Sequence, residues 1–107
     1  MKSVRFFVPL ASVASTLLLI GAQKGDAEKG KKLFEQCSVC HNSDTDEKKV
    51  GPSLKGLFER KKLKNGKPVT DEQVLAQINA GGGGMPPFGD KLSPEDKQDL
   101  LAYLHTL

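Results

Sequence analysis

The feature that most constrains this chain is the pentapeptide Cys-Ser-Val-Cys-His at residues 37–41. It holds both cysteines of the 107-residue chain and one of its two histidines. Two cysteines three positions apart, followed at once by a histidine, fit three kinds of site. These are a disulfide, half of a zinc site, or the covalent attachment of haem.

The surrounding sequence separates these three alternatives. A zinc site needs four ligands, usually from a second pair, and only His105 remains, without paired spacing. A redox disulfide of the thioredoxin type needs a βαβ setting, and no strand pattern is present. A plain disulfide stays open as the structural alternative. In haem attachment Cys37 and Cys40 become thioethers to two vinyl groups and His41 reaches the iron, so the pentapeptide favours a c-type haem.

The N-terminus predicts a secretory signal over residues 1–22. A basic start is followed by an apolar run of about 15 residues and then Gly-Ala, and this run is shorter than the roughly 20 residues of a spanning helix. We expect cleavage after residue 22, or as late as residue 27, which leaves one domain over 23–107 in the periplasm. The alternative is an uncleaved segment that tethers the domain to the membrane. Export suits haem attachment outside the cytoplasm.

The charge balance of the exported domain gives no reason to expect nucleic acid as a partner. Loss of Lys2 and Arg5 lowers the net charge from +3 to +1, so the basic pI of the precursor is no evidence for nucleic acid or an anionic membrane. Lysines at 55, 61, 62 and 64 form a basic stretch, which either steers an acidic partner or is simply a solvated face.

Helix signals predict an all-α domain of three to five short helices joined by long loops. Asp26 is expected to cap a helix over 27–37, Thr70 a helix that stops at the glycines from 81, and Ser93 the last helix. A short helical turn is expected at residues 54–58. Long loops in so small a domain usually carry function.

Met85 is the candidate for the second axial ligand of a haem iron. It is the only methionine left after the signal, and it lies in Gly-Gly-Gly-Gly-Met-Pro-Pro, on no helical face. Glycines permit unusual dihedrals and prolines stiffen the backbone after Met85, so this loop is suited to present one side chain. The alternative is an ordinary core methionine. His105 is expected to be exposed rather than a ligand.

These motifs together resemble the class I c-type cytochromes of bacteria, over residues 25–107. The resemblance implies the cytochrome c fold wrapped around one covalently attached haem. It also implies that Pro52 offers its carbonyl to His41, and that Arg60 lies near a haem propionate unless it is only a solvated charge. Gly30 and Phe34 would pack on the C-terminal helix at Leu100 and Tyr103. The matching segments are GDAEKGKKLFEQCSVCH, VGPSLKGLFERK, GGGGMPPF and DLLAYL.

The resemblance implies a one-electron carrier and not an enzyme. Its iron would be held by His41 and Met85, and a methionine ligand raises the reduction potential. The expected partners are larger redox proteins, as donor and acceptor, in transient contacts with a monomer. The alternatives are a haem sensor or peroxidase-like module, and a tethered electron-transfer subunit of a larger complex. The chain lacks tryptophan, which some relatives use to bond a propionate.

Overall fold

The computed structural model describes residue 3 and residues 25–107, so the predicted signal, apart from residue 3, lies outside the described residues. The described part contains three α-helices, α1 (Ala27–Phe34), α2 (Asp71–Ala80) and α3 (Pro94–Leu104), and one 3-10 turn, η2 (Leu57–Glu59). Pairing of β type in these residues is limited to two isolated bridges, which confirms the all-α prediction. Within residue 3 and residues 25–107, we find no helix with the length and apolar character needed to span a membrane.

Side-chain caps start each α-helix where the sequence predicts. Asp26 accepts from two backbone N–H groups of the first turn of α1. Thr70 accepts from the N–H of Gln73 at 3.1 Å, which forms one half of the predicted capping box. Ser93 and Asp96 form a complete capping box at the start of α3, with both bonds at 3.0 Å. These bonds satisfy N–H groups that have no partner inside the helix.

The first helix ends three residues earlier than predicted, at Phe34 instead of Cys37. The N–H groups of Cys37 and Ser38 both donate to the carbonyl of Phe34, at 2.8 and 2.9 Å. The N–H of His41 then donates to the carbonyl of Cys37 at 2.9 Å. The chain therefore passes from α1 into a series of tight turns that contain the pentapeptide.

Helices α1 and α3 cross at Gly30, as predicted. A Cβ atom added there would lie 2.6 Å from the carbonyl carbon of Asp99 and 2.8 Å from Cβ of Tyr103. Phe34, one turn further along, packs its ring 5.2 Å from that of Tyr103, and it shares the buried core with Leu100. The absence of a side chain at Gly30 allows the two backbones to approach each other.

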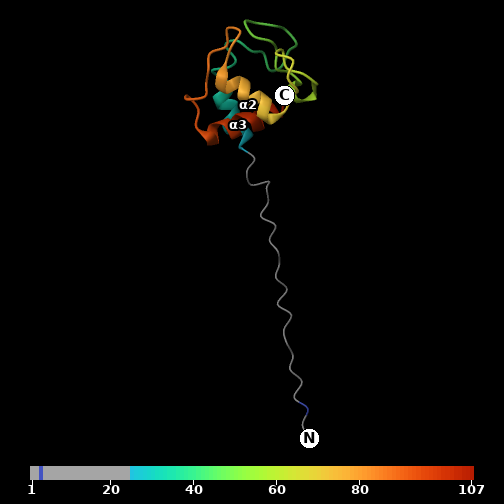
Figure 1. The fold of residues 1–107 in the computed structure, drawn as a ribbon, viewed down its shortest axis with the longest axis vertical. Helices are drawn as coiled ribbons and strands as arrows, with labels where there is room; N and C mark the ends of the chain where they lie inside the picture. The colour runs from blue at the N-terminus through green and yellow to red at the C-terminus, as the bar shows by residue number, and fades with distance from the viewer. Residues whose placement is uncertain (1–2, 4–24) are drawn as a thin grey trace.

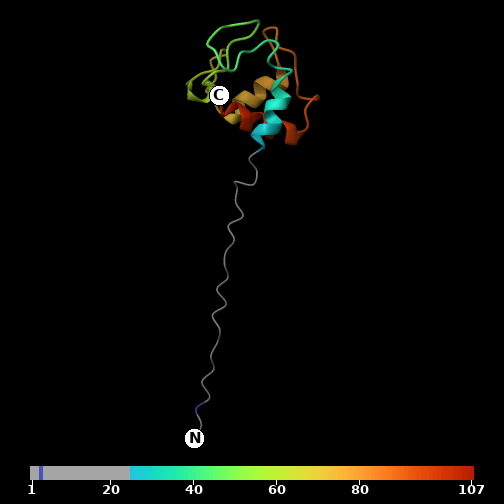
Figure 2. The same ribbon diagram turned by 180° about the vertical axis from the view of Figure 1, so that it is seen from behind.

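The three helices lie together, the connection after α1 arches over one end of them, and the connection between α2 and α3 runs from that end along their side to the start of α3 (Figures 1 and 2). The connection after α1 is green to yellow-green, and the connection between α2 and α3 is orange. The C-terminus lies beside the yellow-green segment in both views, where the rings of His105 and Phe58 stack at 3.6 Å. The two connections therefore lie near each other at one end of the group of helices, the helical layer.

Candidate functional site

A cavity of about 660 Å³ lies between the helical layer and the long loops. Its volume is within the usual range for a small-molecule or cofactor pocket. Seven of the eight buried hydrophobic residues of the core also line this cavity. They are Phe34, Leu57, Val74, Ile78, Leu92, Leu100 and Leu104. The core is thus the apolar wall of a cavity and not a solid cluster of side chains.

Cys37 and Cys40 both line the cavity, and both are free thiols. Burial raises the pKa of the Cys37 thiol, and the neighbouring Cys40 adds to the rise. A raised pKa favours the neutral thiol over the thiolate. The structure thus presents two free thiols to a largely apolar space and does not join them as a disulfide.

His41 lies in the cavity wall with a fixed ring orientation. Its Nδ1 is 2.7 Å from the carbonyl oxygen of Pro52. A carbonyl only accepts, so Nδ1 carries a proton, and in the neutral imidazole Nε2 then has the free lone pair. A Cβ atom added at Gly51 would lie 2.5 Å from Cε1 of the ring, so only glycine leaves room for His41 here. The arrangement prepares Nε2 as a metal ligand.

Met85 enters the same cavity from the loop after α2. Gly81, Gly82, Gly83 and Gly84 all have positive φ, from 63° to 115°. Side-chain-bearing residues rarely adopt these dihedrals, so the glycine run is what permits this path. Met85 is half-buried, and its backbone pairs with that of Gly82 at 2.9 and 3.1 Å. The loop thus presents one thioether to the cavity, as the sequence predicts.

Two other candidate residues lie outside the cavity wall. Arg60 is exposed, and its Nη2 donates to the carbonyl of Lys55 at 2.6 Å. Its role toward a propionate therefore stays a prediction. His105 is exposed, as expected, and its Nε2 lies 2.6 Å from Oδ1 of Asp71 while its ring stacks on Phe58. These contacts use His105 as a link between the ends of α2 and α3.

Two cavity residues were not identified as functional from the sequence. Gly51 directly precedes Pro52, and nothing local in the sequence indicates that a histidine ring will lie against it. Gln77 is a polar residue at the spacing of Val74 and Ile78, on the face of α2 that lines the cavity. This spacing places Gln77 on the same helix face as the apolar residues, and the sequence alone contains that signal.

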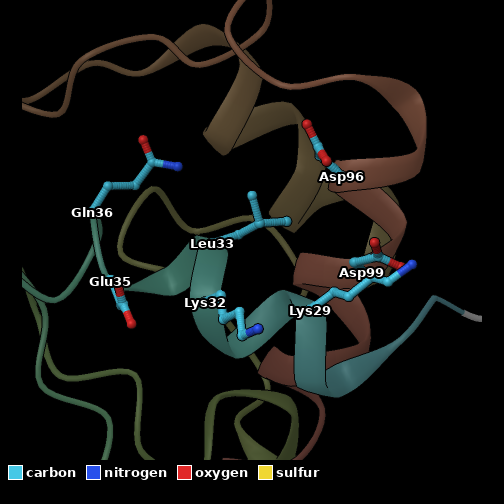
Figure 3. Close-up of a pocket in the computed structure, with 7 residues that line it drawn as sticks. All are labelled: Lys29, Lys32, Leu33, Glu35, Gln36, Asp96 and Asp99. Atoms are coloured by element: carbon cyan, nitrogen blue, oxygen red, sulfur yellow. The ribbon is translucent and has the colours of Figure 1, made fainter.

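A second, smaller hollow of about 400 Å³ lies between α1 with the turn after it and α3 (Figure 3). Its wall carries charges of both signs, from Lys29, Lys32, Glu35, Asp96 and Asp99. Asp99 already accepts a hydrogen bond from the N–H of Asp26 at 2.7 Å. This hollow is a solvated groove beside the helix crossing.

The residues around the large cavity fit the haem that the pentapeptide predicts. The apolar wall suits a macrocycle, two thiols are free for thioether bonds, and one imidazole nitrogen and one thioether are available to an iron ion. Within residue 3 and residues 25–107, no group of three or more His, Cys, Asp or Glu residues is placed to hold a metal ion. The zinc alternative therefore lacks a ligand set in the described part of the chain.

Comparison with known proteins agrees with this fit. Residues 25–104 match the family described as cytochrome C oxidase, cbb3-type, subunit III. The chain is 35% identical to a cytochrome c-553-like protein of Synechocystis sp., over 80% of this chain and 73% of that protein. It is 31% identical to cytochrome c6 of Gloeothece citriformis, over 89% of each chain. The structure of cytochrome cH from Methylobacterium extorquens matches with a TM-score of 0.62 and 26% identity, over 78% of this chain and 100% of that one. The chain therefore belongs to the cytochrome c family of electron carriers, which hold a covalently bound c-type haem with its iron.

Proposed function

We propose that this chain carries single electrons between larger redox proteins in the periplasm, with the haem iron held between His41 and Met85. The observation that carries the proposal is one apolar cavity that brings together two free thiols, an oriented imidazole and a thioether. When bound, the haem supplies reversible cycling between Fe(III) and Fe(II). The chain's residues hold it, orient its ligands and exclude water.

Each residue has a distinct task in this proposal. Cys37 and Cys40 anchor the group covalently through their sulfur atoms. His41 offers Nε2, and the carbonyl of Pro52 keeps the proton on Nδ1. Met85 offers its sulfur, a soft ligand that favours the reduced iron and so raises the potential.

The cavity wall supports a carrier over a peroxidase-like module. Among the described residues that line it, His41 is the only histidine and no arginine is present. Peroxide chemistry needs a polar group on the distal side to move protons. The polar groups next to Met85 are the amide of Gln77 and backbone atoms, which do not titrate near neutral pH.

The optical spectrum of the purified ferric protein tests this function. Ligation by Met85 gives a far-red charge-transfer band from sulfur to iron, and carbon monoxide added after reduction leaves the spectrum unchanged. Met85→Ala should abolish the band and allow carbon monoxide to bind. A wild-type protein that lacks the band and binds carbon monoxide rapidly would instead support a sensor or peroxidase-like function.

The charge distribution supports a transient contact with an acidic partner. Segment 55–67, the basic segment, holds six basic residues and one acidic residue. The other residues from 25 to 107 hold seven basic and twelve acidic residues, so the charges of a nearly neutral domain are separated. Leu63, Lys64 and Asn65 of this segment line the cavity. Its potential would attract an acidic surface to the cavity rim.

A second candidate function is an electron-transfer subunit of a larger complex. It is favoured by the description of the matching family, which names a subunit of an oxidase. An uncleaved N-terminus that retains the protein in the membrane fraction would support it. Purification of the native protein from both the soluble and the membrane fractions distinguishes the two candidates.

The structure supports signal cleavage after residue 22 over cleavage after residue 27. Gly25 packs directly on the backbone of α3 at residues 98 and 99. Asp26 caps α1 and donates its N–H to the buried carboxylate of Asp99. Cleavage after Ala27 would remove these contacts, and a lost N-cap alone costs about 1 kcal/mol. Intact mass spectrometry of the exported protein should give an N-terminus at residue 23.

A further inference from the structure

The amide of Gln77 is the polar side-chain group that α2 contributes to the cavity wall. Gln77 lies in the last turn of α2, between the buried side chains of Val74 and Ile78, and all three line the cavity. A polar side chain at such a position needs hydrogen-bond partners to offset its desolvation. The partners of this amide indicate its role.

Gln77 binds the methionine loop through both its backbone and its side chain. Its carbonyl accepts from the N–H of Gly81 at 2.8 Å, and its Nε2 donates to the carbonyl of Gly81 at 3.2 Å. The same Nε2 lies 3.8 Å from the sulfur of Met85. Asn65 donates its Nδ2 to Oε1 of Gln77 at 3.4 Å. A carbonyl cannot donate, so the nitrogen of the Gln77 amide must face Gly81, and Asn65 supports that orientation.

The rest of the methionine loop is bonded to itself. Gly82 and Met85 exchange two backbone hydrogen bonds, and Gly83 and Gly84 between them have φ values of 63° and 94°. Two positive φ values at the central positions are typical of a type I′ β-turn. Within residues 25–107, the side-chain hydrogen bonds that reach residues 81–85 come from Gln77. The turn is a stiff unit, and Gln77 sets its position on α2.

We propose that Gln77 is the positioning residue for Met85. By holding Gly81 and facing the sulfur, it keeps the thioether directed into the cavity and resists its withdrawal. This inference rests on the proposed ligation of the iron by Met85. It predicts that loss of the Gln77 amide makes Met85 easier to displace by an external ligand.

The test is the affinity of the ferric, haem-loaded protein for imidazole, which competes with Met85 for the iron. Gln77→Leu removes both donated hydrogen bonds, and we expect it to raise the affinity about tenfold, which corresponds to the loss of roughly one hydrogen bond. Gln73→Leu is the matched control, because Gln73 lies on the same helix, is half-buried, and is not part of the cavity wall. We expect the control to bind imidazole within twofold of wild type.

A second variant keeps the inference testable if Gln77→Leu does not fold. Gln77→Glu preserves the side-chain length but replaces the donor by an acceptor, so it should also raise the affinity for imidazole. Unchanged affinity in either folded Gln77 variant, or an equal rise in Gln73→Leu, overturns the positioning role. Failure of the proposed function is a separate result, because a wild-type protein without the far-red band shows no ligation by Met85 at all.

Discussion

Replacement of Gly30 by alanine has two opposite effects on stability, one on helix α1 by itself and one on its crossing with α3. Alanine is the better helix former, by about 1 kcal/mol, so an isolated α1 would gain stability. In the structure, however, the new Cβ would overlap the carbonyl oxygen of Asp99 and would lie 2.6 Å from its carbonyl carbon, against the 3.4 Å at which ordinary contact begins. The helices must therefore separate by at least about 0.8 Å to relieve the contact with the carbon alone, and by more to relieve the contact with the oxygen.

The net effect of Gly30→Ala combines these two opposing contributions. The obstructing atoms are mainly backbone, which cannot move aside by a rotamer change, so we take the upper part of the usual cost of overpacking, about 3 kcal/mol. After the gain in helix propensity, we expect a loss of about 2 kcal/mol in the free energy of unfolding. For a domain of this size that lowers Tm by roughly 8–16 °C.

The assay is unfolding of the haem-loaded protein by guanidinium chloride and by heat, followed by far-ultraviolet circular dichroism. Lys31→Ala is the control, since Lys31 is exposed on the same helix, and its effect should stay within about 0.5 kcal/mol. An unchanged or increased stability of Gly30→Ala would refute the close approach of the helices at this residue.

Three further predictions concern the methionine loop, the C-terminus and the basic segment. Gly83→Ala should lower the free energy of unfolding by about 1 kcal/mol, because its φ is +63° in open space. Gly81→Ala should lower it further and weaken the far-red band, because its Cβ would lie 2.8 Å from the carbonyl carbon of Pro86. Unfolding by guanidinium chloride and the ferric spectrum measure these effects. His105→Ala should lower the free energy of unfolding by about 1 kcal/mol through loss of its ring stacking and its exposed hydrogen bond to Asp71. Its visible spectrum should stay as in wild type, and a changed spectrum would contradict the placement of His105 outside the cavity. Lys64→Glu should slow reduction by hexacyanoferrate(II) roughly tenfold at low salt, with little effect at high salt, while Lys31→Glu, away from the cavity rim, changes the rate much less. Equal slowing by the two variants in stopped-flow measurements would argue against steering by the basic segment.

The helix starts were predictable because their signals are local. Asp26, Thr70 and Ser93 each lie within three residues of the N–H groups that they bond, so the sequence contains both partners of each cap. The end of α1 was not predictable in the same way. The apolar face of Leu33 and Phe34 continues to Cys37, and that periodicity is the same whether the last turn is helical or a series of tight turns.

The candidate site was predictable where its chemistry is carried by residue type. Candidate haem-attaching cysteines and candidate histidine and methionine ligands are recognisable from identity and spacing, and the structure brings all four predicted residues to one cavity. Gln77 differs, because its role depends on the distance between its amide and a loop that folds back onto α2. The contact of His105 with Asp71 likewise depends on how α2 and α3 meet, over 34 residues of separation.

The overlap between core and cavity explains why so small a domain tolerates long loops. A core residue normally stabilises a protein by contact with other side chains, but seven of the eight buried hydrophobic residues here have one side on the cavity. These side chains expose only 2–8% of their surface, but a bound group that fills the cavity adds packing contacts on their cavity side, so it contributes to folding as well as to chemistry. The methionine loop is anchored on α2 at both ends, because the amide of Gln77 holds Gly81 and the N–H of Phe88 donates to the carbonyl of Ile78 at 2.9 Å. Substitutions such as Leu100→Ala should for this reason affect stability and reduction potential together, because they alter the same wall.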